Sequence, residues 1–186
     1  MSTTTPPKLL TAEEYFAHDG PDCPTELVRG EIVEMNRPGF RHGAVCLRIG
    51  RFIDEFAEAN ELGQAACNDS GVITERGPDT VRGPDVAFFS YDRIPKGELP
   101  EGYPETMPEL AFEVLSPSDR WPLVEEKIGE YLAAGIDFVV VVDPAAVTMQ
   151  IFSTVGCIAE LDADDEFSLP EVLPGFSMTV ERMIRR

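Results

Sequence analysis

The stretch PELAFEVLSPSDRWPLVEEKIGEYLAAGI, residues 108–136, decides the fold. In its first part, LAFEVL at 110–115, both sets of alternating positions are apolar except at Glu113, which predicts a strand buried on both faces. An isolated carboxylate out of water costs several kcal/mol unless it is paired, protonated or bound to a metal. Glu113 therefore needs a partner.

A helix pattern follows this strand. Lys127 lies at the border of its apolar stripe, and a turn at 116–119, with Ser118 or Asp119 as the N-cap, would fold the helix back over the strand. We therefore expect Lys127 to lie near Glu113. The stripe has helical spacing and consists of Val124, Ile128, Tyr131, Leu132 and Gly135.

A second apolar run, VRGPDVAFFS at 81–90, carries Asp85 at the head of its strand. If Asp85, Glu113 and Lys127 converge, the two acids can hold a hard cation such as Mg²⁺ through oxygen. The cation and the lysine would then activate water and stabilise the charge that develops on a phosphodiester. In the alternative interpretation, Asp85 caps a turn and Glu113 forms an internal salt bridge with Lys127.

Length and composition predict one domain. The chain has 186 residues, of which 43% are hydrophobic and 26% charged, enough for a single well-buried core. We assign a flexible tail to residues 1–8 and the domain to 9–186. No apolar run is long enough to span a bilayer and the N-terminus lacks a signal-peptide layout, so we expect a cytoplasmic protein without a membrane partner.

The charge balance disfavours nucleic acid as a partner. Fifteen basic residues against 34 acidic ones give a formal net charge of −19, which opposes binding to a polyanion. A compact basic strip on the helix predicted at 41–60, formed by Arg41, Arg48 and Arg51, is the candidate DNA contact. Solvated arginines explain the strip equally well.

The remaining pattern predicts an α/β or α+β fold, with a central mixed sheet flanked by helices. Helices are expected at 41–60 and 180–184, and a capping box at Thr11 opens a short one. Residues 91–108 show no periodicity and form a long loop. The four cysteines are far apart in sequence and are interpreted as isolated buried thiols. Strands are expected at 26–35 as a hairpin, and at 64–74, 85–90, 110–115, 136–142, 147–153 and 157–161.

These motifs resemble the Uma family of restriction-endonuclease-like proteins, which is similar in fold to the PD-(D/E)XK nucleases. The resemblance extends over residues 9–184. It is carried by GPDVAF at 83–88, FEVLSPSD at 112–119, Lys127-x-x-x-Tyr131-x-x-x-Gly135 and VDP at 142–144, with weaker matches around Glu26, His42 and 173–177.

The resemblance implies that Asp85 and Glu113 are catalytic acids and the ligands of Mg²⁺ or Mn²⁺. The chain departs from the superfamily pattern at Leu115, where the motif lysine would stand. Lys127 is the predicted substitute. Glu26 and His42 are candidates for an auxiliary acid and for a proton-transfer or phosphate contact.

The sequence thus predicts a Mg²⁺-dependent endonuclease that hydrolyses DNA phosphodiester bonds. Two other classes of function are alternatives. One is a catalytically weak or inactive nuclease-fold protein that acts as a binding or scaffold protein, and the other is a metal-dependent hydrolase of another phosphate ester. The sequence does not identify the oligomeric state, and a homodimer is one alternative.

Overall fold

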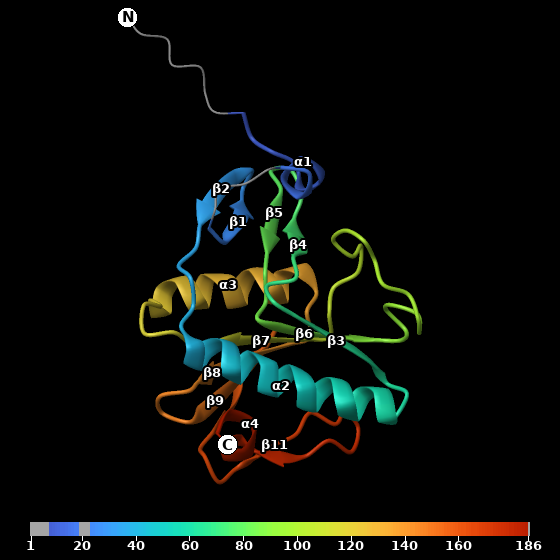
Figure 1. Ribbon diagram of the computed structural model, residues 1–186, viewed down its shortest axis with the longest axis vertical. Helices are drawn as coiled ribbons and strands as arrows, with labels where there is room; N and C mark the ends of the chain where they lie inside the picture. The colour runs from blue at the N-terminus through green and yellow to red at the C-terminus, as the bar shows by residue number, and fades with distance from the viewer. Residues whose placement is uncertain (1–7, 19–22, 186) are drawn as a thin grey trace, which may run out of the picture.

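The computed structural model describes residues 8–18 and 23–185 and has a central mixed sheet flanked by helices, as predicted (Figure 1). The predicted tail lies outside the described residues except for Lys8, whose ammonium pairs with Glu14. Within the described parts of the chain, no helix is long and apolar enough to cross a membrane.

The central sheet has six strands in the order β10-β9-β8-β7-β6-β3. Only β7 and β8 run parallel among these neighbours, and α3 connects them. The strands are β3 (Gly63–Cys67), β6 (Val86–Ser90), β7 (Leu110–Val114), β8 (Phe138–Asp143), β9 (Thr148–Ser153) and β10 (Gly156–Leu161).

A smaller four-stranded sheet lies on the other side of α3, in the order β2-β1-β5-β4. Its hairpin β1 (Thr25–Val28) and β2 (Glu31–Glu34) is the one predicted from the sequence. The strand predicted at 64–74 is in fact two strands in different sheets, β3 and β4 (Val72–Glu75). The short strand β5 (Thr80–Arg82) was not predicted.

The helices cover the two faces of the central sheet. α2 (Phe40–Ala59) and α4 (Val180–Ile184) close one face, where Val45, Ile49 and Ile53 pack on β6 and β7. α3 (Trp121–Ala134) covers the opposite face and packs between the two sheets, with Ile128 and Tyr131 buried (Figure 1). The short α1 (Ala12–Phe16) packs on the small sheet behind the predicted capping box at Thr11.

Local sequence explains where α3 begins and ends. Pro122 stands in its first turn, where a missing N–H costs nothing, and Gly135 ends it at a φ of 103°, a conformation that glycine adopts without strain. The N-cap is Arg120, so the expected cap at Ser118 or Asp119 was wrong. Asp119 instead accepts a hydrogen bond from the backbone N–H of Ser116, which satisfies the turn before the helix.

The C-terminal region adds one element that the sequence did not predict. β11 (Glu166–Phe167) and β12 (Met178–Thr179) form a two-stranded sheet beside the α2 face. Its Phe167 belongs to the same core cluster as Phe112.

The prediction of four buried thiols was wrong, since three of the four cysteines are half-buried and Cys157 is exposed.

Candidate functional site

Asp85 and Glu113 stand opposite each other on neighbouring antiparallel strands. Val86 pairs with Phe112, so the same register, continued by one residue beyond β6, places Asp85 across from Glu113. The backbone N–H of Val114 donates to Oδ2 of Asp85 at 2.7 Å, which ties the two strand ends together. Opposite residues of an antiparallel pair share one face, so both carboxylates can act in one site.

Both acids line a cleft of about 620 Å³ between the small sheet, α2 and α3. Glu26, His42 and Lys127 line the same cleft. The structure thus brings together every residue that the sequence analysis proposed for catalysis or as an auxiliary.

Lys127 lies between two carboxylates. Its Nζ is 3.0 Å from an oxygen of Glu113 and 3.0 Å from Oε1 of Glu26, and it donates to the carbonyl of Gly83 at 3.1 Å. Its side chain is 15% exposed. Burial works against the charged ammonium, but Glu113 and Glu26 raise the pKa of Lys127, so the lysine carries a positive charge.

Glu113 is held by two donors from α3. Besides the bond from Lys127, Tyr131 Oη–H donates to Oε1 at 2.8 Å. Burial raises the pKa of Glu113 to about 7, against the lowering effect of Lys127, and the charge of Asp85 adds to the rise. Glu26, whose pKa is lowered, also helps to keep the ammonium of Lys127 charged.

Glu26 extends this network to the small sheet. It accepts from Arg82 at 2.8 Å and from the backbone N–H of Gly83 at 3.1 Å, and Arg82 in turn forms a two-pronged pair with Glu130 at 2.5 and 2.9 Å. Burial would raise the pKa of Glu26, but Lys127 and Arg82 lower it. A Cβ at Gly83 would lie 2.7 Å from the carbonyl oxygen of Asp69, so this close approach requires glycine.

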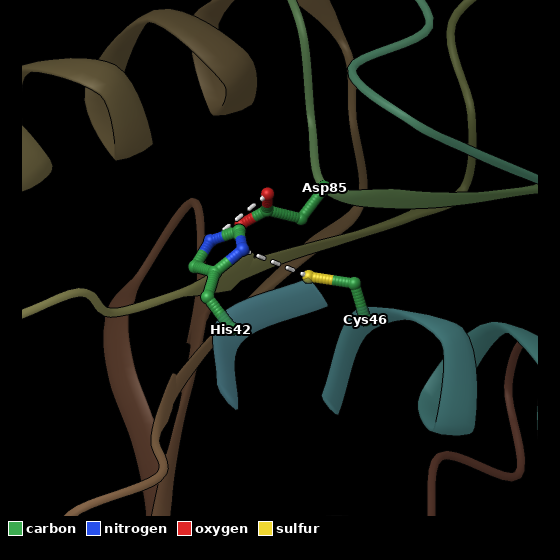
Figure 2. Close-up of side chains that lie close together, drawn as sticks. All are labelled: His42, Cys46 and Asp85. Carbon is green, nitrogen blue, oxygen red and sulfur yellow. Dashed lines mark hydrogen bonds and ion pairs between the residues drawn. The ribbon is translucent and has the colours of Figure 1, made fainter. Parts of the chain in front are cut away.

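His42 approaches the site from the other side, at the start of α2. Its Nε2 is 3.2 Å from Oδ1 of Asp85, and its Nδ1 is 3.4 Å from Sγ of Cys46 (Figure 2). The hydrogen bond to Asp85 raises the pKa of His42, although burial opposes this. Burial raises the pKa of Cys46, and the negative charge of Asp85 strengthens the effect.

The predicted basic strip lies on α2, and its arginines bond within the chain. Arg41 donates to the carbonyl of Pro144 and Arg48 to that of Arg182, while Arg51 pairs with Glu55. Leu115, which stands at the position of the superfamily lysine, packs with the core cluster under α3 and lines the cleft.

Sequence reasoning missed several members of the site. Cys46 follows His42, and Tyr131 follows Lys127, by four residues on a helix, a spacing that indicates a shared face and could have found both. No spacing in the sequence indicates that Arg82 and Glu130 belong to the site, because their pairing depends on how the small sheet packs on α3.

Comparison with known proteins agrees with this architecture. The sequence profile of the Uma2 family, described as "Putative restriction endonuclease", matches residues 12–181. The chain belongs to this family.

A solved structure has a similar fold. The crystal structure of a protein described as "a putative nuclease belonging to DUF820", from Anabaena variabilis, is similar with a TM-score of 0.78 and 19% sequence identity, over 94% of this chain and 97% of that one. At this identity the likeness concerns the fold alone. A comparison with curated proteins gives no match.

Proposed function

We propose that the protein is a Mg²⁺-dependent endonuclease that hydrolyses phosphodiester bonds of DNA. The observation that carries the proposal is the convergence of Asp85, Glu113 and Lys127 on one cleft. Membership of the Uma2 family, described as "Putative restriction endonuclease", supports the same class of activity.

The two acids suit a hard cation. Asp85 and Glu113 offer only oxygen, the ligand type that Mg²⁺ and Mn²⁺ prefer. An ionised carboxylate has about four acceptor positions, and the described partners of each acid leave some of these available. When bound there, the cation would neutralise charge on the phosphate and lower the pKa of a water molecule.

Lys127 would supply the positive charge that Leu115 cannot. Its ammonium is held by Glu26 and Glu113, so it is positioned before a substrate arrives. Tyr131 fixes the orientation of Glu113, and Arg82 fixes that of Glu26. His42, through its contact with Asp85, would orient that carboxylate or transfer a proton at the cleft.

A second candidate is a nuclease-fold protein that binds a partner or forms a scaffold with weak catalysis or none. The formal net charge of −19 favours it, because a polyanionic substrate is repelled. The closed network around Lys127 also favours it, because the ammonium already has three acceptors.

A cleavage assay separates the two candidates. Supercoiled plasmid and single-stranded DNA are incubated with the protein and Mg²⁺ or Mn²⁺, beside the variants Glu113→Gln and Lys127→Met. The nuclease proposal expects each variant, assayed under conditions in which it is still folded, to cleave roughly 100-fold more slowly, the scale of losing one positioned electrostatic group. Glu125→Gln is the matched control, because Glu125 lies on α3 and bonds to Trp121 outside the cleft. Absence of metal-dependent cleavage by the unaltered protein overturns the proposal.

A further inference from the structure

His42 and Cys46 form a pair of ligand side chains on one face of α2. They are four residues apart near the start of the helix, and Nδ1 of His42 is 3.4 Å from Sγ of Cys46. Asp85 approaches the same imidazole from the head of β6. Figure 2 shows the imidazole of His42 lying between the carboxylate and the thiol.

The three side chains are close enough for one metal ion. One ligand atom of each lies within 4.8 Å of the other two. In a tetrahedral site with metal–nitrogen and metal–sulfur distances of about 2.0 and 2.3 Å, neighbouring ligand atoms are roughly 3.5 Å apart. Rotation of the side chains, with one nitrogen of His42 turned to the ion, would close the cluster around it.

The ligand chemistry differs from that of the two strand acids. A thiol, an imidazole and a carboxylate together favour borderline-soft ions, whereas Mg²⁺ binds oxygen. Cys46 is half-buried, and the side chains of His42 and Asp85 are 13% and 10% exposed. His42 and Asp85 also line the cleft, so an ion can enter from it and keep one position open towards it.

We propose that His42, Cys46 and Asp85 form a second metal site, for a thiophilic divalent cation of which Zn²⁺ is the representative. Binding displaces the thiol proton of Cys46 and, where the imidazole of His42 is protonated, one of its ring protons. Both pass to solvent and leave a thiolate and a neutral imidazole as ligands. The site provides three protein ligands, and water or an oxygen of a bound molecule takes the fourth position.

Asp85 is a ligand both of the proposed Mg²⁺ site and of the proposed Zn²⁺ site, and this has a functional consequence. One carboxylate cannot serve both ions in full, so Zn²⁺ at this site competes with Mg²⁺ or Mn²⁺ for Asp85 and inhibits cleavage. This inhibition rests on the proposed nuclease function, whereas the binding of Zn²⁺ does not.

Binding is tested on the reduced, chelator-treated full chain. Zn²⁺ affinity is measured by competition with a chromophoric chelator, and Co²⁺ is used as a second probe, since a cysteine ligand adds a sulfur-to-cobalt charge-transfer band. We expect one saturable Zn²⁺ per chain. Cys46→Ser and His42→Gln should each weaken Zn²⁺ binding at least tenfold, and Cys46→Ser should remove the band.

Two cysteine variants serve as controls. Cys67 in β3 is half-buried like Cys46, and its pKa is also raised, by burial and then by nearby acids, but it is outside the three-residue cluster. Cys157 is exposed on β10. Cys67→Ser and Cys157→Ser should bind Zn²⁺ like the unaltered protein. Urea unfolding of each variant checks that the fold is retained.

The outcomes separate this site from the nuclease proposal. Zn²⁺ binding that survives Cys46→Ser, that is lost in either control, or that is absent below millimolar Zn²⁺ overturns the site, even if the protein cleaves DNA. Zn²⁺ binding that requires Cys46 and His42 supports the site, and in a protein that cleaves no DNA it leaves only the nuclease proposal overturned.

Discussion

The cleft has two walls, one formed by α3 and one by the start of α2. Each holds one strand carboxylate in a different way, Glu113 on the α3 wall and Asp85 on the α2 wall. On the α3 wall, both oxygens of Glu113 accept from side chains, and the charges continue through Lys127 and Glu26. On the α2 wall, the described contacts of Asp85 include one backbone N–H and the imidazole of His42, and the thiol of Cys46 lies nearby. The difference indicates that the charge of Glu113 is compensated within the protein by the α3 wall, while Asp85 on the α2 wall is the acid whose charge is more available to a bound ion.

The largest effect should come from removing the central charge of the α3 wall. Lys127→Met keeps the packing of the stem but leaves Glu26 and Glu113 buried without their shared cation, so we expect the free energy of unfolding to fall by about 3–5 kcal/mol. Urea unfolding in the presence of a chelator measures this. Adding Glu113→Gln should recover a large part of the loss, because one uncompensated charge is removed with the lysine. Independent effects of the two changes would contradict a coupled network.

A smaller loss is expected at the outer end of the same network. Glu130→Gln removes one carboxylate from Arg82, which keeps Glu26 as a partner, so the free energy of unfolding should fall by about 2 kcal/mol. Glu125→Gln, on the same helix but exposed, is the control and should change it by less than about 0.5 kcal/mol. A loss at Glu130 no larger than at Glu125 would show that the network ends at Arg82.

Metal binding should stabilise the folded protein through Asp85. At a concentration ten times its dissociation constant, Mn²⁺ should raise the free energy of unfolding by about 1.4 kcal/mol through mass action. Asp85→Asn should lose most of that gain, which thermal unfolding with and without Mn²⁺ detects. The same gain in Asp85→Asn and in the unaltered protein would place the ion elsewhere.

The smallest change in the free energy of unfolding is expected at an exposed ion pair on α2. Arg51 pairs with Glu55 at 3.5 Å, with side chains 50% and 62% exposed, so Arg51→Glu should change the free energy of unfolding by no more than about 0.5 kcal/mol.

The same variant, Arg51→Glu, tests whether the basic strip on α2 contacts DNA. If Arg51 contacts a phosphate, the slope of log affinity for DNA against log salt should fall by about one. An unchanged slope would remove Arg51 from the DNA-binding surface.

Local patterns explain why much of the molecule could be predicted. The helix at 40–59, the hairpin at 25–34 and the buried strand around Glu113 follow from hydrophobic periodicity, which reports which face of an element is buried. The same periodicity placed Lys127 at the border of its stripe and so near Glu113. These contacts join segments that follow each other directly in the chain.

Periodicity does not say which distant segment covers a buried face. Glu26 meets Lys127, and Arg82 meets Glu130, only because the small sheet packs on α3, and the three residues of β5 are too few to show a pattern. Asp85 turns to His42 and Cys46 because α2 begins beside the head of β6. The sequence alone therefore indicated that Asp85, Glu113 and Lys127 lie close together, through the cost of charge in apolar elements. Tertiary packing decided which partner each charge has, because long-range contacts between elements leave no local periodicity.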